Sequence, residues 1–236
     1  MDGFGTTTGV DSVAHGALIR VLQACPVFRV LGDEDLVSIA TKSERVTVER
    51  KEQIGSLNDG FVYVVGRGRA RLLRICGDRE LTLDYVGHGE VFGEQCLFES
   101  NPDGQAIALE AIETVRVPAA LVKKLLASNV AFANAMLGVV AARRRQAEHR
   151  IHAMLSRDVE SRVAEFILDV AARHGIPDPR GILVEFKFTH QEIADYVGST
   201  RETVTLVMGA FKKSGIVLPD HRRALIQDVE ALRKKV

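Results

Sequence analysis

The sequence contains no tryptophan, only three cysteines and no long apolar run. Cys25, Cys76 and Cys96 are odd in number and widely spaced, so they form neither a disulfide framework nor a CxxC metal motif. We expect small buried thiols, no metal and no cofactor. No apolar stretch approaches the roughly 18 residues of a membrane helix. Residues 1–9 lack the basic start and apolar core of a secretory signal, so we expect a cytoplasmic protein.

The chain also lacks a net charge. Thirty-one Lys and Arg residues balance 31 Asp and Glu residues, so the whole chain has no general attraction for nucleic acid and must rely on local patches. Basic residues do gather in the last two fifths of the chain: Arg143 to Arg145, Arg201, Lys212, Lys213, Arg222, Arg223, Arg233, Lys234 and Lys235. The N-terminal part is correspondingly acidic.

Catalytic groupings are missing as well. The histidines at 88, 149, 152 and 190 are scattered, and no nucleophile stands near a base in the sequence. The sequence therefore predicts a protein that is not an enzyme.

Residues 189–217, THQEIADYVGSTRETVTLVMGAFKKSGIV, predict two helices joined by a very short turn. Thr189 stands three residues before Glu192, the spacing of a capping box in which the hydroxyl accepts a backbone N–H and the carboxylate reaches back. Gly198 supplies the positive φ that ends the first helix. Two helices so connected form a helix-turn-helix.

The second helix has its own start signal. Ser199 and Thr200 offer the N-cap, and Glu202 is expected to complete a second capping box. Apolar stripes on both helices predict that they pack together: Ile193 and Val197 on the first, and Val204, Val207 and Phe211 on the second.

In a helix-turn-helix, the second helix enters the major groove with its N-terminal residues facing base edges. Arg can bond guanine O6 and N7 together, and Glu can accept from cytosine N4, so Arg201 and Glu202 are suited to reading a base pair. The alternative is a helical hairpin in which both side chains are merely solvated. The predicted DNA-binding residues are Thr189, His190, Gln191, Thr200, Arg201, Glu202, Thr205, Leu206, Arg222 and Arg223.

The hydrophobic period between residues 44 and 117 is that of short strands. Segments 46–48, 61–65, 70–75, 81–85, 106–111 and 115–117 are apolar or alternating, with glycines between them. This pattern indicates a barrel or jelly roll. The arginines at 67, 69 and 71 have strand period, which predicts a solvated outer face. Short helices are expected at 11–24 and 33–41.

A long helix follows, with apolar spacings of four and three residues that are typical of a coiled-coil seam. The seam positions are Leu137, Val140, Arg144, Ala147, Ile151 and Met154. We expect a symmetric homodimer, which would present two helix-turn-helix units to a palindromic operator with half-sites about 10 bp apart. The alternative is a core helix within one chain.

The remaining segments complete a winged helix-turn-helix. Asp158 caps a helix through Ala172, and 182–188 is predicted as a strand. Segments 216–218 and 224–226 are expected to pair as a wing whose arginines contact phosphates. The expected division is a β-roll domain at 1–128 with flanking helices, a dimerisation helix at 129–156 and the DNA-binding domain at 157–236.

This α+β order resembles the cyclic-AMP receptor and FNR superfamily of bacterial transcription regulators (Crp/Fnr family). The resemblance rests on four segments: GRGRARLL at 66–73, GHGEVFGEQCLF at 87–98, SRDVESRVAEFIL at 156–168 and THQEIADYVGSTRETV at 189–204. It implies a jelly-roll effector domain like those that bind cyclic nucleotides, a dimerisation helix, and a domain that acts on double-stranded DNA at promoters. RNA polymerase is a possible partner in this family.

Departures from the family bear on the effector. Gly93 and Glu94, after the aromatic Phe92, match a pair that contacts phosphate and ribose in the cyclic-AMP branch. The arginine that neutralises the phosphate there is missing, because no Arg or Lys occurs between Glu80 and Val115. Each lost charge-assisted hydrogen bond is worth roughly 1.5–3 kcal/mol. We therefore do not expect cyclic AMP to bind in the usual mode.

Other branches also depart from the sequence. The chain lacks the N-terminal cysteine cluster of the iron–sulfur regulators and the Cys and His ligands of the haem sensors near Gly93 and Gln95. Arg143 and Glu148 match two effector positions of the nitrogen-control regulators that bind 2-oxoglutarate. Candidate effector residues are thus Phe92, Gly93, Glu94, Arg143 and Glu148. An effector-independent regulator is the alternative.

The predicted recognition helix departs at one position. Where the cyclic-AMP receptor branch has a second guanine-reading arginine, this chain has Leu206, so the guanine preference should be weakened or replaced by an apolar contact. The sequence predicts a homodimeric, sequence-specific transcription regulator. The alternative is a ligand-binding module whose helix-turn-helix contacts only proteins.

Overall fold

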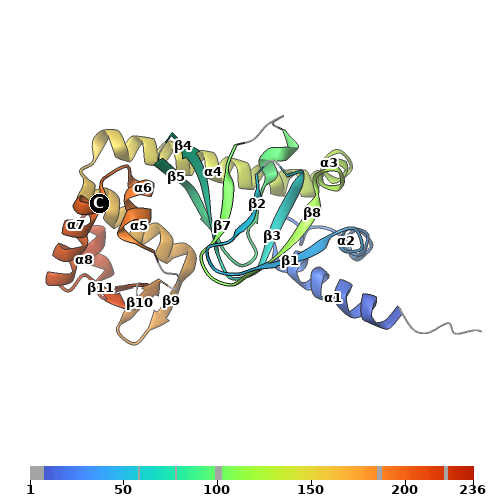
Figure 1. Ribbon diagram of the computed structural model, residues 1–236, viewed down its shortest axis with the longest axis horizontal. Coiled ribbons are helices and arrows are strands. Elements are labelled where there is room, and N and C mark those ends of the chain that lie inside the picture. The colour runs from blue at the N-terminus through green and yellow to red at the C-terminus, as the bar shows by residue number, and fades with distance from the viewer. Residues whose placement is uncertain (1–7, 58, 78, 99–102, 185–187, 221–222) are drawn as a thin grey trace, which may run out of the picture. The chain divides into compact units, whose positions relative to one another are not determined.

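The computed structural model describes residues 8–57, 59–77, 79–98, 103–184, 188–220 and 223–236 (Figure 1). The chain forms two compact units. The first contains residues 1–74 and 84–141, and the second contains residues 75–83 and 142–236. In the described part of the chain, no single helix has the length and apolar composition of a membrane span, although α3 and α4 together pass that test across a bend of 117°.

Two four-stranded antiparallel sheets form the β-roll. One has the order β1 (Glu44–Val48), β8 (Ile112–Pro118), β3 (Phe61–Arg67) and β6 (Val91–Phe92). The other has the order β2 (Gln53–Ser56), β7 (Gln105–Ala108), β4 (Ala70–Cys76) and β5 (Arg79–Val86). The jelly-roll prediction is confirmed. The short strands β2 and β6 lack a clear alternating pattern and were not predicted.

Helices flank the roll. They are α1 (Thr8–Ala24), α2 (Asp33–Ala40), the 3-10 helix η1 (Glu94–Leu97) and α3 (Ala119–Ser128). Their apolar faces join the β1–β8–β3–β6 sheet in a continuous core, in which Phe28 and Phe132 meet edge to face at 5.3 Å between ring centroids. Burial of such aromatic side chains supplies much of the stabilising free energy of a unit of this size.

The prediction of a solvated arginine face is wrong for Arg71, which is buried on β4. Four successive residues of β4 are buried from Ala70 to Leu73, so both faces of this part of the strand are covered and strand period gives no outer face. Arg67 is exposed as expected, and Arg69 pairs with Glu110 at 2.8 Å.

The cysteines differ in their environments. Cys25 is buried, which raises the pKa of its thiol and confirms the prediction there. Cys96 is half-buried and donates to the carbonyl oxygen of Phe61, whereas Cys76 is exposed, against expectation. Among the described residues, no group of three or more His, Cys, Asp or Glu side chains could hold a metal ion.

One long helix, α4 (Val130–Ser156), follows the roll. It is capped by Asn129, whose Oδ1 accepts the backbone N–H of Phe132 at 3.0 Å. The apolar seam positions Leu137, Val140, Ile151 and Met154 are 39–64% exposed within the single chain. An exposed apolar stripe of this kind is characteristic of a helix that packs against a partner.

The second unit is a winged helix-turn-helix. It contains α5 (Val159–His174), α6 (His190–Val197), α7 (Arg201–Lys213) and α8 (Val229–Arg233), with a sheet in the order β11 (Val217–Asp220), β12 (Arg223–Ile226), β10 (Gly181–Val184) and β9 (Gly175–Asp178). The predicted wing is confirmed by the β11–β12 pairing. The strand predicted at 182–188 ends at Val184, and residues 185–187 lie outside the described residues.

Asp158 provides a test of local capping. Its Oδ1 accepts the N–H of Ser161 at 2.8 Å, and this bond holds the pKa of the carboxyl below its ordinary value of 3.8. Asp158→Ala should lower the free energy of unfolding by about 1 kcal/mol at neutral pH. Asp158→Asn keeps a side-chain acceptor, so it should lower the free energy of unfolding by only about a few tenths of the loss in Asp158→Ala. Urea unfolding followed by circular dichroism measures both.

The same site predicts a pH dependence. Because the folded-state pKa is depressed, the charged carboxylate stabilises the fold above the ordinary pKa, and this contribution is lost as the pH falls through the folded-state value. The difference in unfolding free energy between the native protein and Asp158→Asn should therefore shrink below about pH 4. A difference that stays constant would contradict the capping assignment.

Candidate DNA-binding surface

The first helix of the motif, α6, begins with a complete capping box. Thr189 Oγ1 accepts the N–H of Glu192 at 3.1 Å, and Glu192 Oε2 accepts the N–H of Thr189 at 2.6 Å. The helix ends at Gly198, whose φ of 69° lies in the left-handed region. These local predictions are confirmed, and the turn that follows has only the residues needed to start the next helix.

The second capping box, predicted with Glu202, is wrong. Thr200 is the N-cap of α7, and its Oγ1 accepts the N–H of Thr203 at 3.2 Å. The third helical position is therefore Thr203, one residue beyond Glu202, because the cap is Thr200 rather than Ser199. Glu202 remains exposed on the first turn of α7, where a base-reading side chain is needed.

A polar contact connects the two helices at their exposed edge. His190 Nδ1 lies 2.8 Å from Thr205 Oγ1, and the Thr205 hydroxyl donates to the carbonyl oxygen of Arg201 at 2.8 Å. Since the hydroxyl proton is used in that bond, His190 Nδ1 must carry a proton to donate to Thr205. Burial, with Arg201 nearby, lowers the pKa of His190, which favours the neutral ring.

Underneath, the two helices share an apolar contact. Ile193 and Ala194 of α6 and Val204 and Phe211 of α7 are all buried. This packing fixes the crossing of the helices, so that the opposite side of α7 faces solvent.

Two arginines that the sequence reasoning missed hold the C-terminal end of α6. Arg162 of α5 donates to the carbonyl oxygens of Val197 at 2.6 Å and Gly198 at 3.2 Å. Arg150 of α4 donates to the carbonyl oxygen of Tyr196 at 3.0 Å, and its guanidinium lies 4.0 Å from the centroid of that ring. These bonds satisfy carbonyls that a helix end leaves without partners.

Arg150 also binds the hairpin segment that belongs to the same unit. It donates to the carbonyl oxygens of Leu83 and Thr82, both at 2.9 Å. Gln146, one turn earlier on α4, donates to the hydroxyl oxygen of Tyr196 at 3.1 Å. Tyr196 packs on Phe166 of α5 with ring centroids 4.8 Å apart. The helix-turn-helix is therefore held to its unit by a polar and aromatic cluster around one tyrosine.

The exposed face of α7 carries the predicted base-reading set. Arg201, Glu202, Thr205 and Leu206 are all exposed, and Leu206 is 75% exposed. Thr189 and Gln191 are exposed on α6, where Gln191 Nε2 donates to Asp195 Oδ1 at 2.8 Å. The structure thus brings together the predicted residues from α6 and α7 on one side of the motif.

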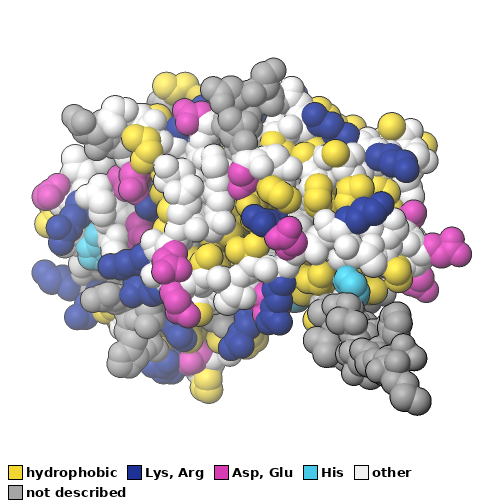
Figure 2. Space-filling model, turned by 45° about the vertical axis from the view of Figure 1, so that its right-hand side comes forward, with side chains coloured by type: hydrophobic (Ala, Val, Ile, Leu, Met, Phe, Trp, Pro, Cys, Tyr) yellow, Lys and Arg dark blue, Asp and Glu magenta, His cyan; other side chains and the backbone are white. Residues whose placement is uncertain are grey.

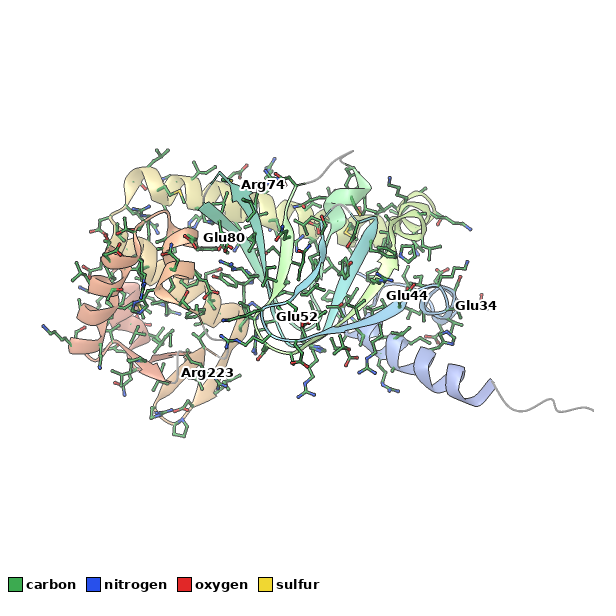
Figure 3. All side chains as sticks on the ribbon, in the orientation of Figure 1. Glu34, Glu44, Glu52, Arg74, Glu80 and Arg223 are labelled. Atoms are coloured by element: carbon green, nitrogen blue, oxygen red, sulfur yellow. The ribbon has the colours of Figure 1, made fainter. Side chains whose placement is uncertain are left out.

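The C-terminal part of the chain carries an excess of positive charge. Residues 142–236 contain 17 Lys and Arg against 13 Asp and Glu, whereas residues 1–141 contain 14 against 18. Figure 2 shows Lys and Arg side chains, in dark blue, gathered at the lower left of the view. Arg223 begins β12 of the wing, opposite Asp220, and is partly buried (Figure 3). Arg222 lies outside the described residues.

The predicted effector residues of the roll are buried. Phe92 is fully buried and stacks on Tyr63, with ring centroids 4.8 Å apart and planes 4° apart. Gly93 has a φ of 83°, and a Cβ there would lie 2.6 Å from the carbonyl oxygen of Phe61, so the position requires glycine. The side chain of Glu94 is also buried. Arg71 of β4 is also buried in the roll, so the roll holds a cation outside residues 80–115.

Arg143 and Glu148, the other predicted effector residues, lie on α4. Glu148 is exposed and pairs with Arg144 at 3.3 Å, one helical turn away. Arg143 is partly buried. Glu148 thus has a partner on its own helix, a pairing typical of a solvated helix face.

Comparison with known proteins places both units in one family. The Crp-like helix-turn-helix domain family matches residues 161–235, and the cyclic nucleotide-binding domain family matches residues 52–129. The global nitrogen regulator of Synechococcus elongatus is 30% identical over 178 residues, which are 74% of this chain and 80% of that protein. The CRP-like cAMP-activated global transcriptional regulator of Mycobacterium tuberculosis is 27% identical over 176 residues, 74% of this chain and 79% of that protein.

Solved structures agree on the fold. FixK2 from Bradyrhizobium japonicum has a TM-score of 0.69 at 23% identity, over 81% of this chain and 96% of that one. The helix-turn-helix, the roll and the 30% identity over most of a relative lead to one conclusion. The chain belongs to the Crp/Fnr superfamily of transcription regulators.

Proposed function

We propose that this protein is a homodimeric regulator that binds a palindromic operator and reads its sequence with α7. The observation that carries the proposal is the exposed set Arg201, Glu202, Thr205 and Leu206, held in place by the Thr200 cap and the His190 contact. Arg and Glu on the first turn of a recognition helix have the donors and acceptors that a G·C pair presents in the major groove. Such a regulator would act in the cytoplasm, with RNA polymerase as a possible partner.

The homodimer rests on α4. Four apolar seam residues are exposed along this helix. Their spacing is the one at which the side chains of two helices interdigitate in a coiled coil. A symmetric contact would bury these residues of both chains and so remove the apolar surface of both helices from water. It would also supply two recognition helices, one for each half-site.

The effector assignment rests on charge. In this proposal cyclic AMP does not act in the usual mode, since residues 80–115, where the cyclic-AMP branch has its phosphate-binding arginine, contain no Arg or Lys, and the buried Arg71 of β4 lies outside that segment. A small dicarboxylate such as 2-oxoglutarate is the alternative, supported by the positions of Arg143 and Glu148 and by the similarity to a global nitrogen regulator. Control without any small molecule is a further alternative.

Arg201→Ala should abolish preference for the operator over random DNA. The loss of one bidentate contact per half-site costs roughly 1–3 kcal/mol of discrimination at its base pair. Fluorescence anisotropy with operator and scrambled DNA, across a salt series, measures the effect. Arg45→Ala is the matched control, because it removes the same charge from an exposed residue of β1. Unchanged preference in Arg201→Ala would exclude the base-reading role.

The double variant Leu137→Asp/Ile151→Asp should sediment as a monomer, because charges replace the exposed apolar seam. Analytical ultracentrifugation gives the answer directly. The matched control is Val30→Asp/Val37→Asp, which places charges at exposed apolar positions outside the α4 seam and should leave the dimer intact. A dimer that survives the seam variant would mean that another surface joins the chains.

Cyclic AMP at millimolar concentration should leave operator affinity unchanged within about twofold, because its phosphate would forfeit charge-assisted hydrogen bonds. The same titration with 2-oxoglutarate tests the alternative effector. Tightening of operator binding by cyclic AMP of about tenfold or more would contradict the charge argument, and the cation would then have to come from elsewhere in the roll, where Arg71 is buried.

A further inference from the structure

Leu206 is a large apolar residue on the exposed side of α7. It is 75% exposed on α7, whereas Val204 and Phe211, which pack the helix onto its unit, are buried. At about 100° per residue, Leu206 lies on the same side of the helix as Glu202 and Gly209, which stand four residues before it and three residues after it. A single exposed leucine is ordinary on a protein surface. A leucine one helical turn after Glu202 places a large apolar group on the face that carries the predicted base-reading residues.

Gly209 is the second unusual residue of this face. It stands in the interior of α7, where glycine is the least favourable residue after proline. A Cβ at this position would meet nothing within 4 Å, so nothing inside the described structure requires glycine there. The missing side chain leaves the backbone open beside Leu206, and an approaching surface could come close at this point.

We infer that Leu206, with the open backbone at Gly209 beside it, contacts the C5-methyl group of a thymine next to the G·C pair read by Arg201 and Glu202. This inference rests on the proposed function. The thymine methyl is the apolar group that base pairs present in the major groove, and Leu206 has no donor or acceptor with which to read any other edge. Glu202, one helical turn before Leu206, and Thr205, the residue before it, supply polar groups that orient the helix over the same step.

The contact gives this chain its own operator preference. A thymine at the position next to the guanine would be selected by burial of its methyl group against Leu206. Cytosine presents only a hydrogen at C5, so a C·G pair would leave the leucine without an apolar partner while water is displaced around it. The specified half-site is thus a G·C pair followed by a T·A pair with the methyl group toward α7.

Removal of that methyl group alone is the test. After selection of an operator from random DNA, each thymine is replaced in turn by uracil, which differs only at C5, and binding is measured by anisotropy. We expect one thymine per half-site to respond, with affinity about fourfold weaker for one substitution and roughly 15-fold weaker when both half-sites are changed. Leu206→Ala should bind the thymine and uracil operators equally, whereas Val37→Ala, at an exposed apolar residue of α2, should retain the difference.

Two further variants separate recognition from structure. Leu206→Arg should move the preference at that position from T·A toward G·C, since arginine can bond guanine O6 and N7. Gly209→Ala should raise thermal stability, because alanine is the better helix former, yet weaken operator binding if the backbone approaches DNA closely. A residue that served only the fold would not show these opposite effects.

The outcomes are distinct. If uracil is neutral at every position while Arg201→Ala still destroys operator preference, the thymine contact is wrong and Leu206 serves another surface, such as a protein partner. If the uracil effect persists in Leu206→Ala, another side chain reads the methyl group. If no DNA sequence is selected at all, the proposed function itself fails and this inference with it.

Discussion

The helix-turn-helix depends on two guanidinium groups that bind the carbonyl end of α6. Arg162 takes the oxygens of Val197 and Gly198, and Arg150 takes that of Tyr196 while its guanidinium stacks on the tyrosine ring. A charged donor on a helix-end carbonyl is stabilised by the negative end of the helix dipole. Because the arginines come from α5 and α4, these bonds fix the end of α6, and with it the turn from which the recognition helix starts.

The first turns of α6 and α7 satisfy their own polar groups. The caps of both helices and the His190–Thr205 contact use local side chains, whereas Arg201 and Glu202 are exposed. Affinity for DNA must come from local positive charge, since the whole chain is neutral. In the proposed function, specificity therefore depends on a few side chains of one helix, Leu206 among them.

Local chemistry made most of the motif predictable from sequence. Thr189, Glu192 and Gly198 form their cap and stop within a few residues, and most strands of the roll, though not β2 and β6, have a pattern clear enough to be found. One prediction failed because packing from distant parts of the chain covers both faces of β4 and buries Arg71. Another failed on a local detail, because the cap of α7 is Thr200, one residue later than the capping box with Glu202 requires. Arg150 and Arg162 could not be assigned, because their acceptors lie 35 or more residues away in sequence.

The most direct test of this account is selection of bound DNA from a random pool by the purified full-length protein, without added small molecule, followed by sequencing. The account predicts an enriched palindrome whose half-sites are about 10 bp apart and contain a G·C pair flanked by T·A. Binding of the enriched DNA should weaken steeply with salt, as expected when several phosphates are neutralised. Binding that is independent of sequence at every salt concentration, by a protein that remains dimeric, would contradict the claim that α7 reads bases.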